Sequence, residues 1–413
     1  MANSLLQNLT NVTTTSDSDV LYIVTNPAST PADGKITVGE LANSVLSKVY
    51  FRPEDSPFAV GGGDDTAAIQ WAIDQAAVVP MAGMKFQSSG GTFQGGADAP
   101  GSGAVLLTRP VYDVSTVILK HRVMLEGIGW GVQLRQIANT NGPVVRNKFD
   151  STAHAKYNII RNLTVRGNRA NQTTANVGIL LEGDATNNYT NPIDEDYDAN
   201  SVIDNVYVWD CKGDGIRLIG AGGVFVRGCK VRSCDGNGIY SFQDNNIDNC
   251  DIGWSGLAGL TVVGDSCRVT NVKCWYSGQI TASSGHGFYL TADSGVISGC
   301  TAQDNKAAGF LWDGAFGWAG SALEADNNDS AGSDYPGFDF FGSQYCQVMG
   351  IARNRYNAGA TAGTQSIGLR HRGSSTLNDI RLVAAAGVWG VLTASSGDTV
   401  KSGSTIVING TAL

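Results

Sequence analysis

A glycine followed by an apolar residue recurs along the middle of this sequence, and this repeat constrains the fold more than any other feature. The pairs are Gly178-Ile179, Gly215-Ile216, Gly238-Ile239, Gly259-Leu260, Gly287-Phe288, Gly309-Phe310, Gly337-Phe338 and Gly368-Leu369. A unit that recurs but cannot bury its apolar side alone is typical of a solenoid, in which each coil covers its neighbour. The repeat therefore predicts a stack of coils.

A second pattern precedes most of these glycines and supports the first. It reads apolar, any, Asn/Gly/Asp, apolar, any, apolar, as in residues 203–208 and 247–252. Its fourth position is occupied by Leu163, Val206, Cys229, Cys250, Val272, Cys300, Ile351 and Ile380. One coil therefore takes about 22 residues, and the long gap after Cys300 predicts a hidden coil centred on Ser321.

The residues around this pattern indicate strands. Apolar and polar residues alternate, which is the period of a strand rather than a helix. The third position holds mainly Asn or Gly, as at Asn162, Asn205 and Asn249. These residues accept left-handed backbone conformations, and stacked Asn side chains can hydrogen-bond from coil to coil. We expect short strands joined by tight bends.

The composition limits the class of protein. Gly accounts for 53 of the 413 residues and charged residues for 16%, which suits an all-β solenoid. The net charge of -9, without a basic run, argues against nucleic acid as a partner. The first twenty residues lack the pattern of a secretory signal peptide, and no apolar stretch is long enough to span a bilayer. We expect a soluble chain made in a cytoplasm.

The eight cysteines are expected to be reduced and buried. Several share repeat positions, such as Cys229 with Cys250 and Cys211 with Cys234. Thiols stacked at inward sites behave as small hydrophobes, and synthesis in a cytoplasm disfavours disulfides. Bridges or a metal site are the alternatives. There is no CxxC pair and no phosphate-binding loop, so the sequence predicts no metal and no cofactor.

Four segments follow from these patterns. Residues 1–50, with a strand at 20–24 and a short helix at 38–46, are expected to form an adaptor. Residues 51–100 contain a helix that begins near Asp65 and would cap the stack, then a Gly-rich loop. Residues 101–383 are the coils. Residues 384–413, with strands at 388–392 and 405–408, would form a C-terminal cap or pair across three chains.

The start of the coils resembles a known family. Residues 63–70, followed by 103–107 and 123–129, resemble the capped start of pectate-lyase-like, single-stranded right-handed parallel β-helices. Residues 18–24 and 33–37 resemble the N-terminal, virion-proximal part of bacteriophage tail proteins. Together these resemblances indicate a phage tailspike or tail fibre protein. They imply a homotrimer on the virion that binds, and often cleaves, bacterial surface polysaccharide.

One candidate site resembles that of polygalacturonases, which place acidic residues and Gly-His-Gly before the recurring glycine. Here Asp214 and His286 each match a fragment, but the acidic pair between them is missing. They are three coils apart, or about 14 Å, which is too far to act on one glycosidic bond. We therefore expect His286 to be a surface residue rather than a catalytic one.

A second candidate is a turn rich in aromatic residues. Trp209, Trp254, Trp275 and Tyr276 follow the second pattern at equivalent positions, so they should lie along one edge of the stack and bind sugar rings.

Three aspartates on adjoining coils, Asp210, Asp214 and Asp235, would then be the catalytic carboxylates. The alternative is that the aromatic residues fill a trimer interface or lie beneath a loop, and that the aspartates only satisfy turns.

Two smaller features are open to test. The acidic run 194–198 could hold Ca²⁺, but a solvated loop is the simpler interpretation because the EF-hand order is missing. Arg353 occupies an inward position of the repeat, and a buried Arg needs a paired carboxylate, so we expect the register to slip there.

The sequence therefore predicts a trimeric phage tailspike that recognises host surface polysaccharide, in capsule or lipopolysaccharide, and leaves open whether it also cleaves this polysaccharide by hydrolysis or elimination. A non-enzymatic receptor-binding or structural tail protein is the competing hypothesis. A secreted pectinase-like enzyme is a third, and the missing signal peptide argues against it.

Overall fold

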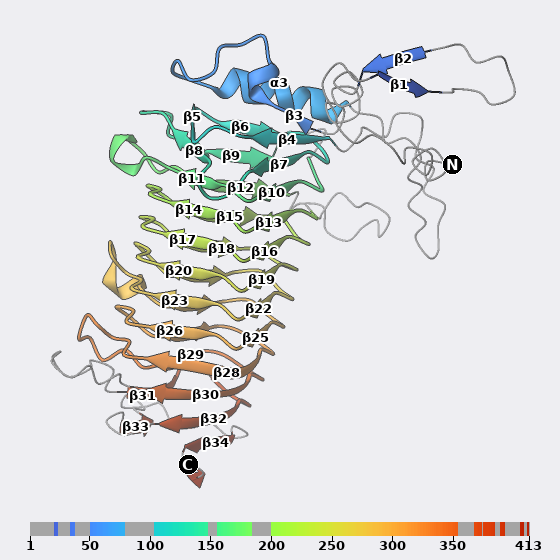
Figure 1. The fold of residues 1–413 in the computed structure, drawn as a ribbon. Coiled ribbons are helices and arrows are strands. Elements are labelled where there is room, and N and C mark those ends of the chain that lie inside the picture. Colours follow the sequence, from blue (N-terminus) through green and yellow to red (C-terminus); the bar gives the residue numbers. More distant parts are fainter. Residues whose placement is uncertain are drawn as a thin grey trace, which may run out of the picture.

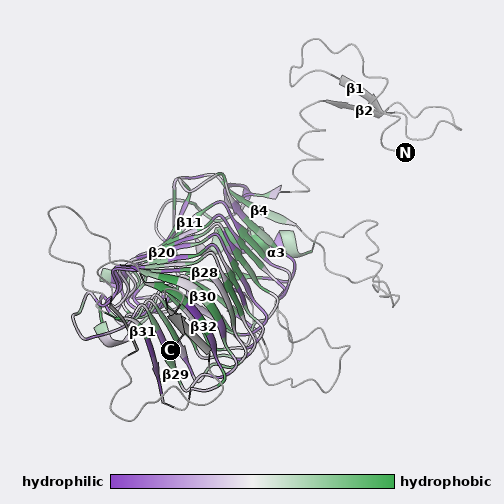
Figure 2. Ribbon diagram, turned by 90° about the horizontal axis from the view of Figure 1, so that it is seen from below, coloured by the Kyte–Doolittle hydropathy of each residue, from purple (hydrophilic) through white to green (hydrophobic). Residues whose placement is uncertain are grey.

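The chain forms a parallel β-helix, visible as a stack of coils in Figure 1. In this computed structural model, the described residues are 20–23, 34–37, 50–78, 103–147, 155–183, 200–353, 367–373, 375–384, 389–392, 405–408 and 411–412. Viewed along the stack in Figure 2, the strands of successive coils lie over one another. The fold class predicted from the repeat is confirmed.

Each coil contributes strands to three parallel ladders. Ladder 1 contains β3 (Tyr50–Phe51), β4 (Ala104–Leu107), β7 (Met124–Gly127), β10 (Ile159–Arg161), β13 (Val202–Asp204), β16 (Phe225–Arg227), β19 (Asn246–Asp248), β22 (Arg268–Thr270), β25 (Val296–Ser298), β28 (Ala319–Asp326), β30 (Gln347–Arg353), β32 (Asp379–Ala384) and β34 (Thr405–Ile408). Ladder 2 contains β5 (Val111–Val114), β8 (Gln133–Gln136), β11 (Thr164–Arg166), β14 (Tyr207–Trp209), β17 (Lys230–Arg232), β20 (Asp251–Gly253), β23 (Lys273–Trp275) and β26 (Thr301–Gln303). Ladder 3 contains β6 (Val117–Leu119), β9 (Val145–Asn147), β12 (Ile179–Glu182), β15 (Ile216–Ile219), β18 (Ile239–Ser241), β21 (Leu260–Val262), β24 (Phe288–Leu290), β27 (Phe310–Asp313), β29 (Phe338–Phe341), β31 (Ile367–Arg372) and β33 (Trp389–Leu392).

The apolar residues of the repeated pairs form one inward column on ladder 3. In register they are Ile179, Ile216, Ile239, Leu260, Phe288, Phe310, Phe338 and Leu369, and all are fully buried. The rings of Phe288 and Phe310 stack with centroids 4.6 Å apart. Since a buried side chain of this size stabilises by roughly 1.5–3 kcal/mol, each coil depends on its neighbours for most of its stability.

The glycines of these pairs are required because the chain turns tightly onto ladder 3. A Cβ on Gly215 would lie 2.3 Å from Cγ1 of Val231, an inward side chain of ladder 2 on the next coil. A Cβ on Gly238 would lie 2.2 Å from Cγ2 of Ile252. No side chain fits at this corner, which gives the sequence repeat its physical cause.

The bend between ladders 1 and 2 has the left-handed conformation expected at the third pattern position. Asn162, Asn205, Asn249 and Asn271 have φ values of 51–56°. Nδ2 of Asn205 donates to Oδ1 of Asn162 on the preceding coil at 2.9 Å, so the predicted stacking of Asn side chains occurs at this pair.

Ladders 1 and 2 join at β28, which runs through the bend without a break. The hidden coil is present, because Ser321 pairs with Ser298 in register, but its fourth pattern position is Leu323, two residues after the expected Ser321. After β28, the residues that occupy the positions of the sequence pattern differ from those expected. Gly350 and Leu382 occupy the pattern's fourth position, not Ile351 and Ile380 as expected.

This shift in register explains Arg353. Ala352, at the inward site, pairs with Ala325 and is buried. Arg353 points outward, with its side chain 43% exposed, and forms ion pairs with Glu324 and Asp326. The predicted shift in register is confirmed.

Helix α3 (Thr66–Ala77) lies at the first coil (Figure 1), and 3-10 turn η1 (Pro53–Asp55) precedes it. Ile69, Ala72, Ile73 and Ala76 are buried in the same apolar cluster as strands of the first coils. The expected helix is present, and its role as a cap stays a prediction. Two further 3-10 turns are η2 (Arg169–Asn171) and η3 (Ala282–Ser284).

Strands also form in both end segments. Strand β1 (Val20–Ile23) pairs antiparallel with β2 (Gly34–Thr37). The ladders continue past residue 383, because β33 and β34 pair in parallel with β31 and β32, and β35 (Thr411–Ala412) then pairs antiparallel with β34. The expected helix at 38–46 and most of the Gly-rich loop lie outside the described residues.

The eight cysteines are free and buried, at inward sites along the coils. Burial raises the pKa of the Cys267 and Cys346 thiols to about 11 and that of Cys300 to about 12. These thiols therefore pack as apolar groups in the stack.

Replacing Gly238 with Ala should destabilise the protein, since the new methyl group overlaps Ile252 and the carbonyl oxygen of Gly259. Overpacking of this kind costs about 1–3 kcal/mol, measured by denaturant unfolding. Gly131→Ala is the matched control because nothing lies within 4 Å of its Cβ position. Equal midpoints for the two variants would contradict the corner constraint.

Candidate functional site

The outward face of ladder 2 brings together the four aromatic residues predicted to bind sugars. Trp209 and Trp275 occupy one register column, which runs Arg166, Trp209, Arg232, Gly253, Trp275, Gln303. Trp254 and Tyr276 each follow this column by one residue, with φ values of 52° and 51°. We call Trp209, Trp254, Trp275 and Tyr276 the aromatic row.

Three members of the row form one tight cluster. The ring centroids of Trp254 and Trp275 are 4.2 Å apart, those of Trp254 and Tyr276 5.8 Å, and those of Trp275 and Tyr276 5.5 Å. Gly253 allows this packing, because a Cβ there would lie 2.7 Å from the Trp275 ring. Trp254 is 43% exposed and Tyr276 40%, so both rings offer apolar area to a ligand.

A second cluster extends the row toward the N-terminal coils. Trp209 stacks on Tyr207 with centroids 6.2 Å apart, and Tyr207 lies 6.0 Å from Trp130. Sequence analysis missed Tyr207 and Trp130. Tyr207 was detectable, since it precedes Trp209 by two residues on the same side of a strand. Trp130 comes from the turn after β7, and no repeat position marks it.

The guanidinium groups of two arginines lie over rings of the aromatic row. The guanidinium carbon of Arg166 lies 4.5 Å from the Trp209 ring centroid, and that of Arg232 lies 4.5 Å from Trp275 and 6.0 Å from Trp254. Such cation–π contacts contribute about 0.5–2 kcal/mol each. Arg232 therefore covers two rings of the first cluster, and Arg166 covers one ring of the second.

Asp251 holds this arrangement in place. It accepts hydrogen bonds from Arg232 at 2.5 Å and from Nε1 of Trp275 at 2.7 Å. Burial alone would raise the pKa of Asp251, but these two donors and the charges of Arg232 and Lys273 lower it below its ordinary value. The rings are thus fixed before any ligand arrives.

The three candidate aspartates do not lie in one site. Asp210 accepts from Arg166 at 3.0 Å and lies 3.6 Å from Nε of Arg169. Nη1 of Arg169 donates to Asp235 at 2.8 Å. One guanidinium in the η2 turn therefore joins Asp210 and Asp235 beside the aromatic row.

Asp214 is separate from this pair and buried, with 4% of its surface exposed. Its carboxylate accepts from the backbone and side chain of Asn237 and from Arg217 at 2.7 Å. It supports the corner that leads onto ladder 3.

His286 is buried, not on the surface as the sequence suggested, since it is only 7% exposed. The rings of Tyr289 and Tyr335 lie 5.7 and 6.0 Å from it, and its Nδ1 has no hydrogen-bond partner among the described residues. Burial lowers its pKa to about 4; Asp339 acts to raise it, and Arg370 and Arg372 to lower it. Tyr335 is in a loop that sequence reasoning could not place.

Asp339 anchors this region. It is fully buried and accepts side-on hydrogen bonds from both Arg370 and Arg372. Two charge-assisted pairs on one carboxylate compensate the cost of burying it.

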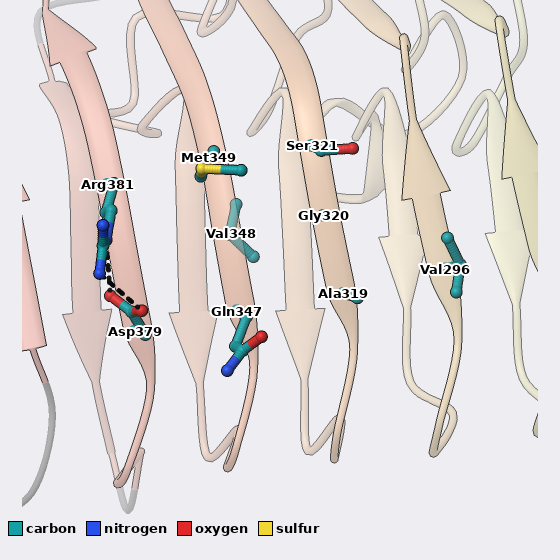
Figure 3. Close-up of a pocket in the computed structure, with 9 residues that line it drawn as sticks. All are labelled: Val296, Ala319, Gly320, Ser321, Gln347, Val348, Met349, Asp379 and Arg381. Carbon is teal, nitrogen blue, oxygen red and sulfur yellow. Dashed lines mark hydrogen bonds and ion pairs between the residues drawn. The ribbon is translucent and has the colours of Figure 1, made fainter.

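A shallow hollow of ≈ 280 Å³ lies on ladder 1, far along the stack from α3. Figure 3 shows its side chains on neighbouring strands, with Val296 at one end of the hollow, the Asp379–Arg381 pair at the other, and Met349 next to that pair. Val296 is 44% and Met349 53% exposed, so the hollow offers apolar side chains next to a charged pair.

The described residues contain no group of three His, Cys, Asp or Glu that could hold a metal ion, and the acidic run 194–198 lies outside them. Nor do they include a helix with the length and apolar character to cross a bilayer.

The fold is similar to solved β-helix proteins. Full-length tailspike protein 2 from an Escherichia coli O157:H7 bacteriophage matches with a TM-score of 0.62 and 17% identity, over 88% of this chain and 46% of that one. The A-module of Azotobacter vinelandii mannuronan C-5 epimerase AlgE4 matches with 0.60 and 16%, over 87% and 100%. DFA-IIIase from Arthrobacter chlorophenolicus A6 matches with 0.54 and 10%, over 81% and 94%.

These likenesses show the fold. The chain spans about half the length of the tailspike proteins that it matches, 47% and 46% for two structures. No protein-family model and no curated protein sequence matches the chain.

The stability of the protein should fall as the pH drops from about 6.5 to about 4. In the unfolded chain the His286 ring gains a proton near pH 6.5, whereas the folded state keeps it neutral down to about 4. The unfolded state therefore binds more protons in this window, which costs up to about 3 kcal/mol.

His286→Gln should remove this contribution, while other titrating groups stay unchanged. Urea unfolding of both proteins across pH 4–7 measures the difference in slope. Parallel curves for the wild type and the variant would exclude a neutral His286 as the cause.

Proposed function

We propose that the chain is a subunit of a bacteriophage tailspike that binds host surface polysaccharide on ladder 2. The supporting observation is the aromatic row, exposed on a face where Asp251 and Arg232 fix the rings in advance. Sugar rings have apolar C–H faces that stack on indole and phenol rings. A rigid row loses little conformational entropy on binding, which favours affinity.

The spacing of the rings suits a polymer. Trp209 and Trp275 are separated by three strand layers in register, or about 14 Å, and Trp254 lies between them. An extended polysaccharide that runs along the stack would contact several rings in turn. Binding through repeated weak contacts is the expected mode for such a ligand.

We propose that the homotrimer forms through ladder 1 and leaves ladder 2 open. Phe225, Val296 and Met349 are 44–53% exposed on the outward side of ladder 1. Burial of these apolar side chains between subunits would be favourable. Residues 1–50 would attach the trimer to other tail proteins of the virion.

Cleavage of the bound polysaccharide is a second candidate, and one observation favours it. Asp210 and Asp235 both contact Arg169, so two carboxylates lie close together next to the aromatic row. Acid/base glycoside hydrolysis requires two carboxyl groups about 5–10 Å apart. Asp214 is a weaker candidate for this role because its side chain is only 5% exposed, against 15% for Asp210 and 25% for Asp235.

Replacing Trp254 or Tyr276 with Ala should weaken polysaccharide binding about tenfold or more, since each removes a stacking surface worth about 1.4 kcal/mol. Affinity electrophoresis in a panel of capsule and lipopolysaccharide polysaccharides measures the loss. Phe341→Ala is the binding control because this ring is similarly exposed, at 40%, but lies on ladder 3. Phe225→Ala, on the proposed trimer face, is included for the measurement of oligomeric state.

Sedimentation velocity on the same variants tests the competing interpretation. If Trp254→Ala or Tyr276→Ala dissociates the oligomer and Phe225→Ala does not, the aromatic row is a subunit interface and the proposal is wrong.

If the protein cleaves its ligand, Asp210→Asn and Asp235→Asn should each lower the release of reducing ends by 100-fold or more, as expected for loss of an acid or base of roughly 10²–10⁴ effect. Asp214→Asn, outside this pair, should have a smaller effect on the rate. Unchanged release in both of the first two variants would remove the pair from the mechanism, and no release by the wild type would leave a binding protein.

A further inference from the structure

The aromatic row carries positive charge in a chain that is acidic overall. On strands β11, β14, β17, β20 and β23, together with the residue after each, the charged residues are Arg166, Lys230, Arg232 and Lys273 against Asp210 and Asp251. Four cations and two carboxylates leave an excess of two positive charges, whereas the whole chain has a net charge of -9. The local sign is opposite to that of the molecule.

The two arginines form ion pairs with the two carboxylates, whereas the two lysines form none within the described part of the chain, although Asp251 is next to both of them in register. Arg166 pairs with Asp210 at 3.0 Å and Arg232 with Asp251 at 2.5 Å. Across the described residues, no carboxylate forms an ion pair with Lys230 or Lys273, and both side chains are exposed. The excess charge is therefore located on these lysines.

Both lysines lie next to the rings. Nζ of Lys230 is 5.2 Å from the Trp130 ring centroid, and Nζ of Lys273 is 5.8 Å from that of Trp275. In register the order is Lys230, Asp251, Lys273, so the backbones of the two lysines stand two strand layers apart, or about 10 Å. A sugar stacked on either indole would have a lysine within reach of its substituents.

A neutral glycan would cover these lysines without offering an anion. Ammonium groups are strongly hydrated, so partial burial without a partner costs binding free energy. A carboxylate, phosphate or sulfate on the sugar would instead form a charge-assisted hydrogen bond with each.

We propose that the polysaccharide bound by the aromatic row is anionic, and that Lys230 and Lys273 recognise its acidic groups. This inference rests on the proposed polysaccharide binding and adds the chemical class of the ligand. The rings supply the contact area and the lysines supply the selectivity.

The test compares each acidic bacterial polysaccharide of the panel with its own carboxyl-reduced form, and phosphorylated ones with their dephosphorylated forms. Wild-type protein should bind the acidic form at least about tenfold more tightly, and this preference should shrink as NaCl rises. The two treatments distinguish carboxylate from phosphate as the anion.

Lys230→Gln/Lys273→Gln should bind the acidic and neutralised forms about equally. The charge-matched control is Arg227→Gln/Arg268→Gln, which removes two exposed cations from ladder 1 and should keep the preference. A preference that persists in the lysine variant would overturn the role of the lysines.

The outcomes separate this inference from the proposed function. Equal binding of acidic and neutralised forms by the wild type, with loss in Trp254→Ala, would overturn the anionic ligand and keep polysaccharide binding. If neither form of any polysaccharide binds, both proposals are wrong.

Discussion

The close approach at the corner before ladder 3 is the constraint on which the rest of the structure depends. Each coil crosses there within contact distance of an inward side chain on the next coil, and only glycine fits, as at Gly215 and Gly238. This contact fixes where one coil begins relative to the next. Because strand residues alternate inward and outward, fixing the corner also decides which side chains reach the surface.

The outward surface of ladder 2 follows from this register. Trp209, Arg232 and Trp275 share a column because the consecutive strands of ladder 2 pair residue for residue. The row is thus built from residues far apart in sequence but rigid in space, since each lies on, or directly after, a strand that pairs with strands on both sides. Sites on regular strands hold their geometry better than sites on loops.

The sequence was sufficient to predict the coils, the inward columns and the aromatic row, because all three depend on local spacing. It was insufficient where a side chain from a turn or loop outside the repeat contacts another coil. Trp130 reaches the row from a turn with no repeat signal, and His286 is covered by rings that include Tyr335, from another loop. The three aspartates looked equivalent by spacing, but Asp214 faces Arg217 while Asp210 and Asp235 share Arg169.

The uniform rise of the stack limits how such a surface can change. Side chains of one column that contact a ligand are spaced by multiples of one strand layer, about 4.8 Å. Inserting or deleting a whole coil between β17 and β20 would move Arg232 relative to Trp275 by one such step and preserve every corner on either side. A ligand with a repeating unit would then be matched or mismatched in discrete steps, so new specificities would arise by changes of coil number as well as by single substitutions.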